Sequence, residues 1–228
     1  MDKIENLKAL RVTEDKRCVW NRTEIVTLKP FDEYRCIFVH IPRTGGTSVS
    51  KALFGNLSGS HISIAEYRSI FDNGEFEDYF KFSFVRNPWD RLVSTYQYLR
   101  AGGAQVNHDL KMQSKIQPYE DFGDFVRSWL LPSALEDGIH FLPQQTFISL
   151  DDENVPLDYI AHFETLHDDF YYIAGKLGLS ASLPHLNASK RTQYKDYYDQ
   201  ETIEIVAELY RKDIELLGYD FDNSVFSR

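Results

Sequence analysis

A glycine-rich turn between an apolar run and an amphipathic segment is the feature that most constrains this chain. Residues 36–50 read Cys-Ile-Phe-Val-His-Ile-Pro-Arg-Thr-Gly-Gly-Thr-Ser-Val-Ser. The apolar run at 36–39 predicts a buried strand, and Val49, Ala52 and Leu53 have helical spacing. A strand, a glycine turn and a helix form a cradle for a phosphate-like anion, because backbone N–H groups and the helix N-terminus converge there.

The turn differs from the P-loop of nucleoside-triphosphate enzymes. That motif places a lysine directly after its second glycine, whereas Thr47 follows Gly46 here and the nearest cation, Arg43, precedes the glycines. An ATP site therefore lacks its usual cation. The predicted anion ligands of the turn are Arg43, Thr44, Gly45, Gly46, Thr47 and Ser48.

A second segment combines a strand pattern with a helix start. Residues 82–85 are strand-like, Asn87 is a favourable N-cap, and Pro88 suits the first helical position. Arg86 therefore ends a strand, and Ser94 lies in the helix that follows. A guanidinium fork and a hydroxyl are suitable ligands for a terminal phosphate, so the two residues predict a second anion site beside this helix start.

The two segments together resemble the nucleotide-binding signatures of sulfotransferases that use 3′-phosphoadenosine 5′-phosphosulfate (PAPS). The first resembles the 5′-phosphosulfate loop, and the second resembles the 3′-phosphate motif, in which a serine follows an arginine by eight positions. The sequences of both motifs resemble most the carbohydrate and Golgi-type branch, which includes heparan sulfate and HNK-1-like sulfotransferases and their bacterial relatives. Later phrases extend the resemblance over about residues 34–220: Leu142-Pro143-Gln144-Gln145, His162-Phe163-Glu164-Thr165-Leu166 and residues 194–198.

This resemblance implies an α/β fold, a three-layer sandwich with a central, mostly parallel sheet of the P-loop-like sulfotransferase type. It implies transfer of a sulfuryl group from PAPS to an acceptor hydroxyl on a carbohydrate, giving 3′,5′-ADP and a sulfate ester. PAPS is then the co-substrate, and no metal ion is expected. A glycan or small-molecule acceptor is the expected partner.

The resemblance also implies roles for single residues. A His-x-Ser phrase at this position carries the catalytic histidine in heparan-type relatives, which makes His61 the candidate general base, with Glu66 as the alternative. The late segment folds back over the nucleotide in the family, so Lys190 and Arg191 are candidate phosphate ligands and Tyr194 a candidate adenine contact.

Arg43 departs from the family, which usually has lysine there. The cation is expected to neutralise charge on the oxygen that leaves with the phosphate. Arginine keeps the charge but does not give up a proton, so a role for Arg43 as proton donor is in doubt while electrostatic stabilisation remains available.

The remaining pattern predicts one domain over residues 1–228. Strands at 36–40 and 82–85 flank a helix at 46–55, which favours a parallel β–α–β unit. Further expectations are a leading arm over residues 1–33 with a strand near 24–28, a strand around His61, a mobile loop at 102–117 as acceptor lid, a strand at 157–163, and helices near 122–130, 166–177 and 203–217.

Composition excludes several classes of protein. The formal net charge of −10 disfavours general nucleic-acid binding. The two cysteines indicate no disulfide framework or metal site, and no apolar run reaches the length of a membrane span. We therefore expect a cytoplasmic enzyme without an integral membrane segment, and the oligomeric state stays open.

Two other functions remain open at this point. A P-loop kinase would use ATP and Mg²⁺, and the missing lysine after Gly46 counts against it. A non-catalytic nucleotide-binding relative would keep the fold without turnover, and arginine at position 43 is the observation that favours it.

Overall fold

The computed structural model describes residues 3–12, 27–59, 61–151, 154–183 and 193–222. The chain divides into two compact units, each made of two segments. Unit 1 comprises Met1–Val85 and Thr146–Leu186, and unit 2 comprises Arg86–Gln145 and Asn187–Arg228.

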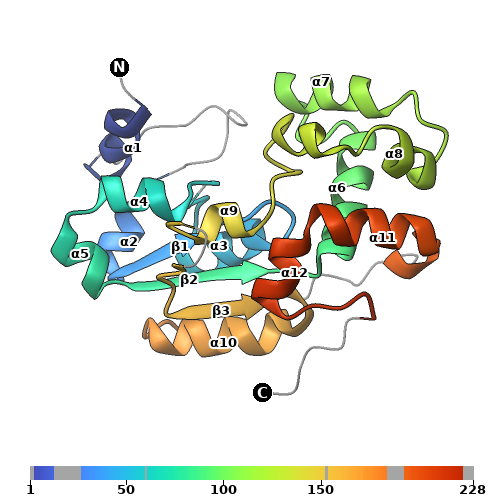
Figure 1. The fold of residues 1–228 in the computed structure, drawn as a ribbon. Helices are drawn as coiled ribbons and strands as arrows, with labels where there is room; N and C mark the ends of the chain where they lie inside the picture. Colours follow the sequence, from blue (N-terminus) through green and yellow to red (C-terminus); the bar gives the residue numbers. More distant parts are fainter. Residues whose placement is uncertain (1–2, 13–26, 60, 152–153, 184–192, 223–228) are drawn as a thin grey trace. The chain divides into compact units, whose positions relative to one another are not determined.

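Unit 1 is built on a three-stranded parallel sheet with the order β1-β2-β3 (Figure 1). The strands are β1 (Cys36–Val39), β2 (Phe80–Val85) and β3 (Tyr159–His162). Val39 pairs with Ser83 and Val85 pairs with His162, so the carboxyl ends of all three strands lie at one edge of the sheet. The predicted α/β class, the parallel β–α–β unit and the strand at 157–163 are confirmed.

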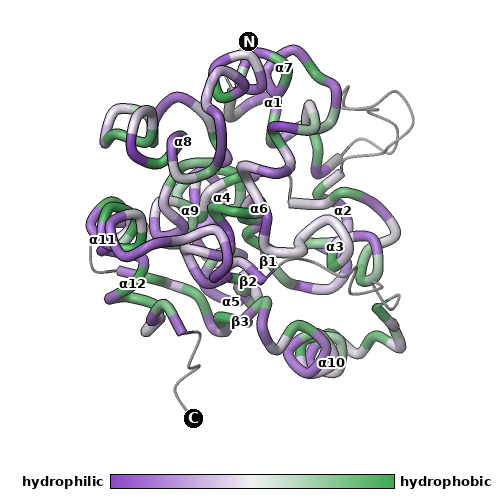
Figure 2. Tube along the Cα trace, turned by 90° about the vertical axis from the view of Figure 1, so that its right-hand side faces the viewer, coloured by the Kyte–Doolittle hydropathy of each residue, from purple (hydrophilic) through white to green (hydrophobic). Residues whose placement is uncertain are grey.

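The helices of unit 1 bury hydrophobic residues. They are α1 (Lys3–Val12), α2 (Lys29–Glu33), α3 (Gly46–Phe54), α4 (Ile64–Ile70), α5 (Asn73–Asp78) and α10 (Leu166–Lys176), with a short 3₁₀ turn η2 (Phe163–Thr165). Among them, α2 contacts β1 and α10 contacts β3. A further helix, α9 (Gln145–Ile148), begins at the last residue of unit 2's first segment. Hydrophobic and hydrophilic residues both occur along α10 in Figure 2, and its Phe170 and Ile173 are fully buried.

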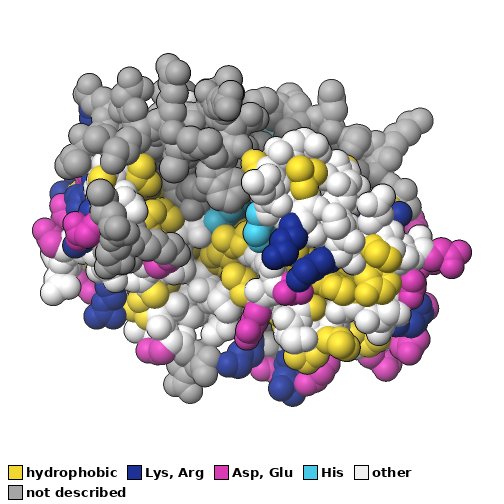
Figure 3. All heavy atoms as spheres, turned by 90° about the horizontal axis from the view of Figure 1, so that it is seen from above, with side chains coloured by type: hydrophobic (Ala, Val, Ile, Leu, Met, Phe, Trp, Pro, Cys, Tyr) yellow, Lys and Arg dark blue, Asp and Glu magenta, His cyan; other side chains and the backbone are white. Residues whose placement is uncertain are grey.

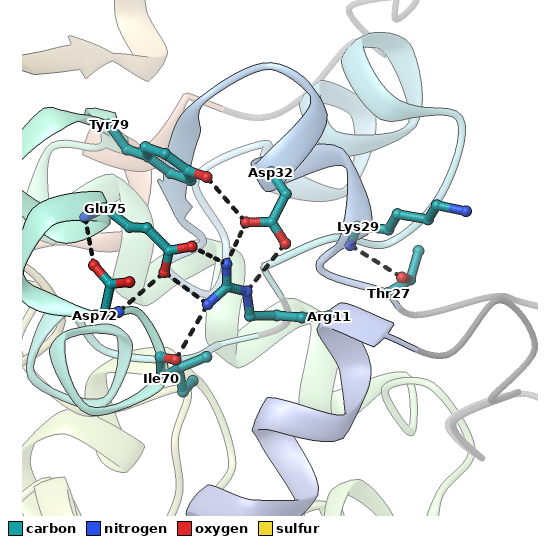
Figure 4. Close-up of polar contacts among 8 residues, drawn as sticks. All are labelled: Arg11, Thr27, Lys29, Asp32, Ile70, Asp72, Glu75 and Tyr79. Atoms are coloured by element: carbon teal, nitrogen blue, oxygen red, sulfur yellow. Dashed lines mark hydrogen bonds and ion pairs between the residues drawn. The ribbon is translucent and has the colours of Figure 1, made fainter.

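The predicted leading arm is helical where the structure describes it. Residues 3–12 form α1. Of the strand expected near 24–28, Thr27 and Leu28 lie outside any strand, and residues 24–26 lie outside the described residues. The helix is fixed by Arg11, whose guanidinium donates to Asp32 on α2 and to Glu75 on α5 (Figure 4). These partners are 21 and 64 residues away, so no local pattern reveals them.

Unit 2 consists of helices around an aromatic core. Its elements are α6 (Pro88–Arg100), α7 (Asn107–Ile116), α8 (Phe122–Ser128), η1 (Pro132–Glu136), η3 (Tyr194–Tyr197), α11 (Gln200–Leu209) and α12 (Arg211–Leu217). Trp89, Phe125 and Phe141 are buried members of its hydrophobic core. The predicted start of α6 is confirmed, because the Asn87 side chain accepts a hydrogen bond from the Trp89 N–H at 3.0 Å.

The expected mobile loop at 102–117 is wrong over most of its length, because residues 107–116 form helix α7. Its Asp109, Met112 and Ile116 are buried at helical spacing. The polar residues between them mask this stripe in the sequence. The acceptor-lid role of the segment is not tested by its helical structure.

The surface agrees with the acidic composition. Lys and Arg side chains on the face drawn in Figure 3 lie among Asp and Glu side chains rather than covering a continuous area. Among the residues that the structure describes, no helix combines the length and apolar character needed to cross a bilayer.

Candidate functional site

The loop after β1 has the geometry of an anion cradle. The Thr44 side chain is fully buried, and its hydroxyl donates to the Ile41 carbonyl at 3.0 Å. Gly45 precedes α3 with φ of 84°, and its carbonyl accepts from the Ser48 N–H at 3.0 Å. A helix leaves the N–H groups of its first turn without intrahelical partners, and α3 begins at Gly46, so this turn is suited to an anion.

The two glycines of the loop are required for different reasons. A Cβ on Gly46 would lie 2.0 Å from Cδ2 of His40, which no side chain tolerates. A Cβ on Gly45 would contact the Phe163 ring at 3.3 Å, and its left-handed φ further disfavours other residues. Phe163 follows β3, so residues after the two outer strands of the sheet, β1 and β3, shape the loop.

Arg43 occupies a strained position in this loop. Its φ is 70°, a left-handed value that non-glycine residues rarely adopt, and its side chain is half-buried. Thr47 is exposed and Ser48 is half-buried at the start of α3.

His61 lies beside this loop, and His40 contacts both of them. Its Nδ1 is 3.0 Å from the His40 carbonyl oxygen, and the two ring centroids are 4.5 Å apart. A carbonyl only accepts, so Nδ1 carries the proton, and Nε2 is the proton-accepting nitrogen of the neutral ring. The tautomer is thus the one that a general base acting through Nε2 requires.

His61 is not in a strand, contrary to the sequence expectation. It has a left-handed φ of 42° in a turn, and the following Ser63 caps α4. Ser60 lies outside the described residues. The polar Ser-x-x-Glu pattern from Ser63 to Glu66 is a capping-box signature that explains why the chain turns here.

Glu66, the alternative base, has a structural role in that cap. Its Oε2 accepts from the Ser63 N–H at 2.9 Å and from the Ser63 hydroxyl at 3.1 Å. A proton taken up by this carboxylate would weaken both hydrogen bonds, so the geometry favours His61 over Glu66 as the base.

Arg86 is buried at the junction of β2 and α6. Its Nε and Nη2 donate to Oδ2 of Asp90 at 2.8 and 2.7 Å, which fixes the guanidinium plane. Its backbone N–H and C=O pair with the side-chain amide of Gln144 at 2.9 and 2.8 Å. Ser94, 5% exposed, lies on α6 eight positions further on.

Sequence reasoning assigned no role to Gln144 or to its partner Asp213. The Asp213 carboxylate is fully buried and accepts from the backbone N–H groups of Gln144 and Gln145 at 2.7 and 2.8 Å. Burial raises the pKa of Asp213, and nearby Arg91 opposes that shift. The Leu-Pro-Gln-Gln phrase was the available signal for Gln144, whereas Asp213 sits in a helical stripe that gives none.

The late segment is described only in part. Lys190 and Arg191 lie outside the described residues. Tyr194 is half-buried in η3, where its hydroxyl donates to the Phe221 carbonyl and its ring meets that of Phe221 edge-on at 5.6 Å. These contacts give Tyr194 a packing role and leave its predicted adenine contact untested.

The predicted site residues thus form two groups. Within unit 1, the loop from Arg43 to Ser48 and the imidazole of His61 meet around His40. Within unit 2, Arg86 and Ser94 share the start of α6. Over the residues described, no three or more His, Cys, Asp or Glu side chains gather so as to hold a metal ion.

Comparison with known proteins identifies the type of fold. A family model described as "Sulfotransferase family" matches residues 27–220. "Carbohydrate sulfotransferase 10" of Gallus gallus is 25% identical over 236 residues, covering 82% of this chain and 65% of its own length. The same-named protein of Rattus norvegicus is 24% identical and covers 95% of this chain and 72% of itself.

A second kind of relative is similar to the same degree. "Carbohydrate sulfotransferase 11" of Rattus norvegicus is 24% identical over 251 residues, covering 91% of this chain and 71% of itself. The chain therefore spans about two thirds of the length of these relatives, and just under two thirds of the Gallus gallus protein. No solved structure matches the chain.

Proposed function

Since the chain belongs to the sulfotransferase family, we propose that it transfers a sulfuryl group from PAPS to a hydroxyl of a carbohydrate. The curated relatives are named carbohydrate sulfotransferases, which favours a glycan acceptor. The products would be a sulfate ester and 3′,5′-ADP. The observation that carries the proposal is the position of His61 beside the anion loop, with Nδ1 hydrogen-bonded to the His40 carbonyl at 3.0 Å.

The loop residues fit the phosphosulfate end of PAPS. A Cβ at Gly46 would collide with the His40 ring, and the backbone of Gly45 is left-handed, so these two residues bring backbone rather than side chains to the start of α3. Arg43 would offset the charge on the oxygen that leaves with the phosphate. Arg86 and Ser94 would take the 3′-phosphate, with Asp90 holding the guanidinium.

The transfer needs one base and no redox change. The acceptor oxygen forms a bond to sulfur as the bond between sulfur and the bridging phosphate oxygen breaks. The acceptor proton passes to Nε2 of His61, and the bond electrons leave on the nucleotide phosphate. His61 thus supplies general base catalysis, and the loop supplies positioning and charge stabilisation.

Isotope transfer tests this proposal. Protein is incubated with PAPS that carries ³⁵S and with a panel of oligosaccharides, and label on the glycan is counted. We expect transfer that is unaffected by EDTA and that falls about 100-fold or more in His61→Ala. Glu66→Gln is the matched control and should lose far less activity at the same stability.

Three outcomes decide between the alternatives. Binding of ATP with Mg²⁺ more tightly than 3′,5′-ADP would favour a kinase and overturn the proposal. Nucleotide binding without transfer or PAPS hydrolysis would favour a non-catalytic relative. Transfer in Glu66→Gln reduced as much as in His61→Ala would remove His61 from its assigned role.

A further inference from the structure

His40 lies between the anion loop and the candidate base, His61. Its contacts with both suggest a role that rests on the proposed function. The side chain is 7% exposed, at the carboxyl end of β1. Three groups surround its ring: Phe38, Gly46 and His61. A buried imidazole at this position does not reach a substrate in solution, so it can influence the reaction only through the residues that it contacts.

The contact with Gly46 is the tighter of the two functional contacts. A Cβ at position 46 would fall 2.0 Å from Cδ2, 2.4 Å from Nε2 and 2.8 Å from Cγ of His40. The Cδ2 and Nε2 atoms of the ring therefore lie against the backbone of the first residue of α3. Interiors are close-packed, so a ring in this position sets the height of the loop above the sheet.

The contact with His61 has two parts. The His40 carbonyl accepts the Nδ1 proton at 3.0 Å, and the two rings are tilted by 48° with their centroids 4.5 Å apart. The hydrogen bond selects the tautomer, and the ring contact limits rotation of the imidazole. The His40 ring also stacks on Phe38, with the ring centroids 5.7 Å apart and an interplanar angle of 10°.

The electrostatics of the pair are compatible with proton uptake by His61. Burial, and then the charge of His61, hold the pKa of His40 well below its ordinary value. His40 is therefore neutral when a proton arrives on His61. A positively charged side chain in its place would oppose that proton by like-charge repulsion.

We propose that His40 is a positioning residue for sulfuryl transfer, which holds the anion loop at Gly46 and the base His61 in one fixed arrangement. It touches neither donor nor acceptor. One ring thus links the group that receives the phosphosulfate to the group that receives the acceptor proton, and displacement of the ring should disturb both.

A double-mutant cycle tests the Gly46 half of the proposal. Gly46→Ala should weaken 3′,5′-ADP binding about 10-fold or more, because the new methyl group collides with the ring and moves the loop. In His40→Ala the space is open, so adding Gly46→Ala should cost little further affinity. Calorimetric titration with 3′,5′-ADP of the unsubstituted protein, the two single variants and the double variant gives the coupling free energy between positions 40 and 46.

Nuclear magnetic resonance tests the His61 half without using activity. Nitrogen–proton correlations of the imidazole distinguish a proton on Nδ1 from one on Nε2, and His61→Ala assigns the signal among seven histidines. We expect a single Nδ1–H tautomer in the unsubstituted protein. His40→Ala keeps the backbone carbonyl but removes the ring that limits rotation of His61, so the imidazole can turn away from the carbonyl and a mixture of tautomers is expected. His140→Ala removes another histidine that is 7% exposed, in unit 2, and should leave the His61 signal unchanged.

Kinetics then complete the test. We expect kcat to fall about 10- to 100-fold in His40→Ala, because a base and a loop that are no longer fixed lose alignment. If His40→Ala does not fold, His40→Gln replaces it, since glutamine fills much of the space without a flat ring.

The possible results are separable. No 3′,5′-ADP binding by the unsubstituted protein overturns the proposed function and this proposal with it. Binding by the unsubstituted protein, combined with additive losses in the cycle and an unchanged His61 tautomer, overturns the role of His40 alone. Non-additive losses in the cycle together with a mixed tautomer in His40→Ala support it.

Discussion

Asp109 on α7 accepts a hydrogen bond from Nε2 of His140 at 3.3 Å, although 31 residues separate them. The same carboxylate accepts from the Tyr98 hydroxyl at 3.0 Å and from the Ala104 N–H at 2.8 Å. Asp109 is 1% exposed, so three elements of unit 2 are joined at one buried charge. This cluster helps to hold residues 107–116 as helix α7, although their polar sequence predicts a loop.

Asp109→Asn should therefore destabilise the protein by about 2–4 kcal/mol, because the amide cannot accept all three hydrogen bonds inside the core. Burial alone would raise the pKa of Asp109, but hydrogen bonds from His140, Ala104 and Tyr98 hold it below its ordinary value. A carboxyl with a lowered pKa in the folded state contributes stability above its unfolded pKa, near 4, and loses it as the pH falls further.

Urea unfolding between pH 7 and pH 3 measures this effect. The difference in unfolding free energy between the two proteins should shrink below about pH 4. Asp137→Asn is the matched control, since Asp137 pairs with Lys115 at 2.7 Å but is 39% exposed; its loss should stay below about 1 kcal/mol. Equal losses in both variants would contradict the assignment of Asp109 as a structural centre.

The guanidinium of Arg86 is 4% exposed and held by Asp90, which predicts a strict requirement for arginine. Arg86→Ala should weaken 3′,5′-ADP binding about 10- to 100-fold, because a charge-assisted hydrogen bond to phosphate is lost. Arg86→Lys should recover little of it, since lysine lacks the planar fork. Asp90→Asn should give an intermediate loss, because the fork is then less firmly oriented.

Calorimetric titration with 3′,5′-ADP distinguishes these variants. Arg127→Ala is the control in the same unit, because Arg127 pairs with Glu201 at 2.6 Å on an exposed surface of α8. Its affinity should match that of the unsubstituted protein. Full binding by Arg86→Lys would show that only charge matters at this position.

Local signals account for the parts of the backbone structure that the sequence predicts correctly. The glycine loop and the Asn87-Pro88 helix start each lie within a few residues of their structural cause, a strand end and a cap. The parallel arrangement of the strands follows from the helix between them. Such features depend on backbone conformation, which short patterns report directly.

The parts that the sequence misses depend on distant partners. Arg11 binds residues 21 and 64 positions away, and Gln144 binds Asp213 69 positions away. Nδ1 of His61 contacts the carbonyl oxygen of His40, 21 positions earlier. A sequence period or a short motif contains no information on which distant residues pair, so a buried polar cluster resembles a loop or hydrophobic core in the sequence.

Arg43 combines a strained backbone with a charge, and two substitutions separate the effects. Arg43→Gly removes the charge and relieves the left-handed φ of 70°, so stability should rise by up to about 1 kcal/mol while kcat falls about 100-fold. Arg43→Lys keeps both charge and strain and should retain kcat within about 10-fold.

Thermal unfolding and initial rates with PAPS check both variants of Arg43. A gain in stability with loss of rate identifies the side chain as functional, since a structural residue would lose both together. If Arg43→Lys raises kcat strongly, a proton-donating cation is preferred at this position, and purely electrostatic stabilisation by Arg43 is wrong.

The Arg11 cluster predicts that the first helix is part of the folded unit rather than an appended arm. The guanidinium donates to Asp32 at 3.0 and 2.5 Å and to Glu75 at 2.8 and 2.7 Å, and it lies 4.3 Å from the centre of the Phe71 ring. Its side chain is 18% exposed, so solvent screens these pairs only in part. Arg11→Met should lower the unfolding free energy by about 1–3 kcal/mol, because it leaves two carboxylates side by side.

The pH dependence of that loss gives the sharper test. Hydrogen bonds from Arg11 lower the pKa of Glu75 against the opposing effect of burial, so the stabilisation is present above the unfolded pKa near 4.3 and is lost as the pH falls below it. Lys8→Met is the control on the same helix, since Lys8 and Glu5 are 46% and 61% exposed. Adding Glu75→Gln to Arg11→Met should recover part of the stability at pH 7, because the repulsion between the carboxylates is removed. If Glu75→Gln recovers no stability in Arg11→Met, then packing of Arg11 on Phe71, rather than its ion pairs, fixes α1 to the rest of unit 1.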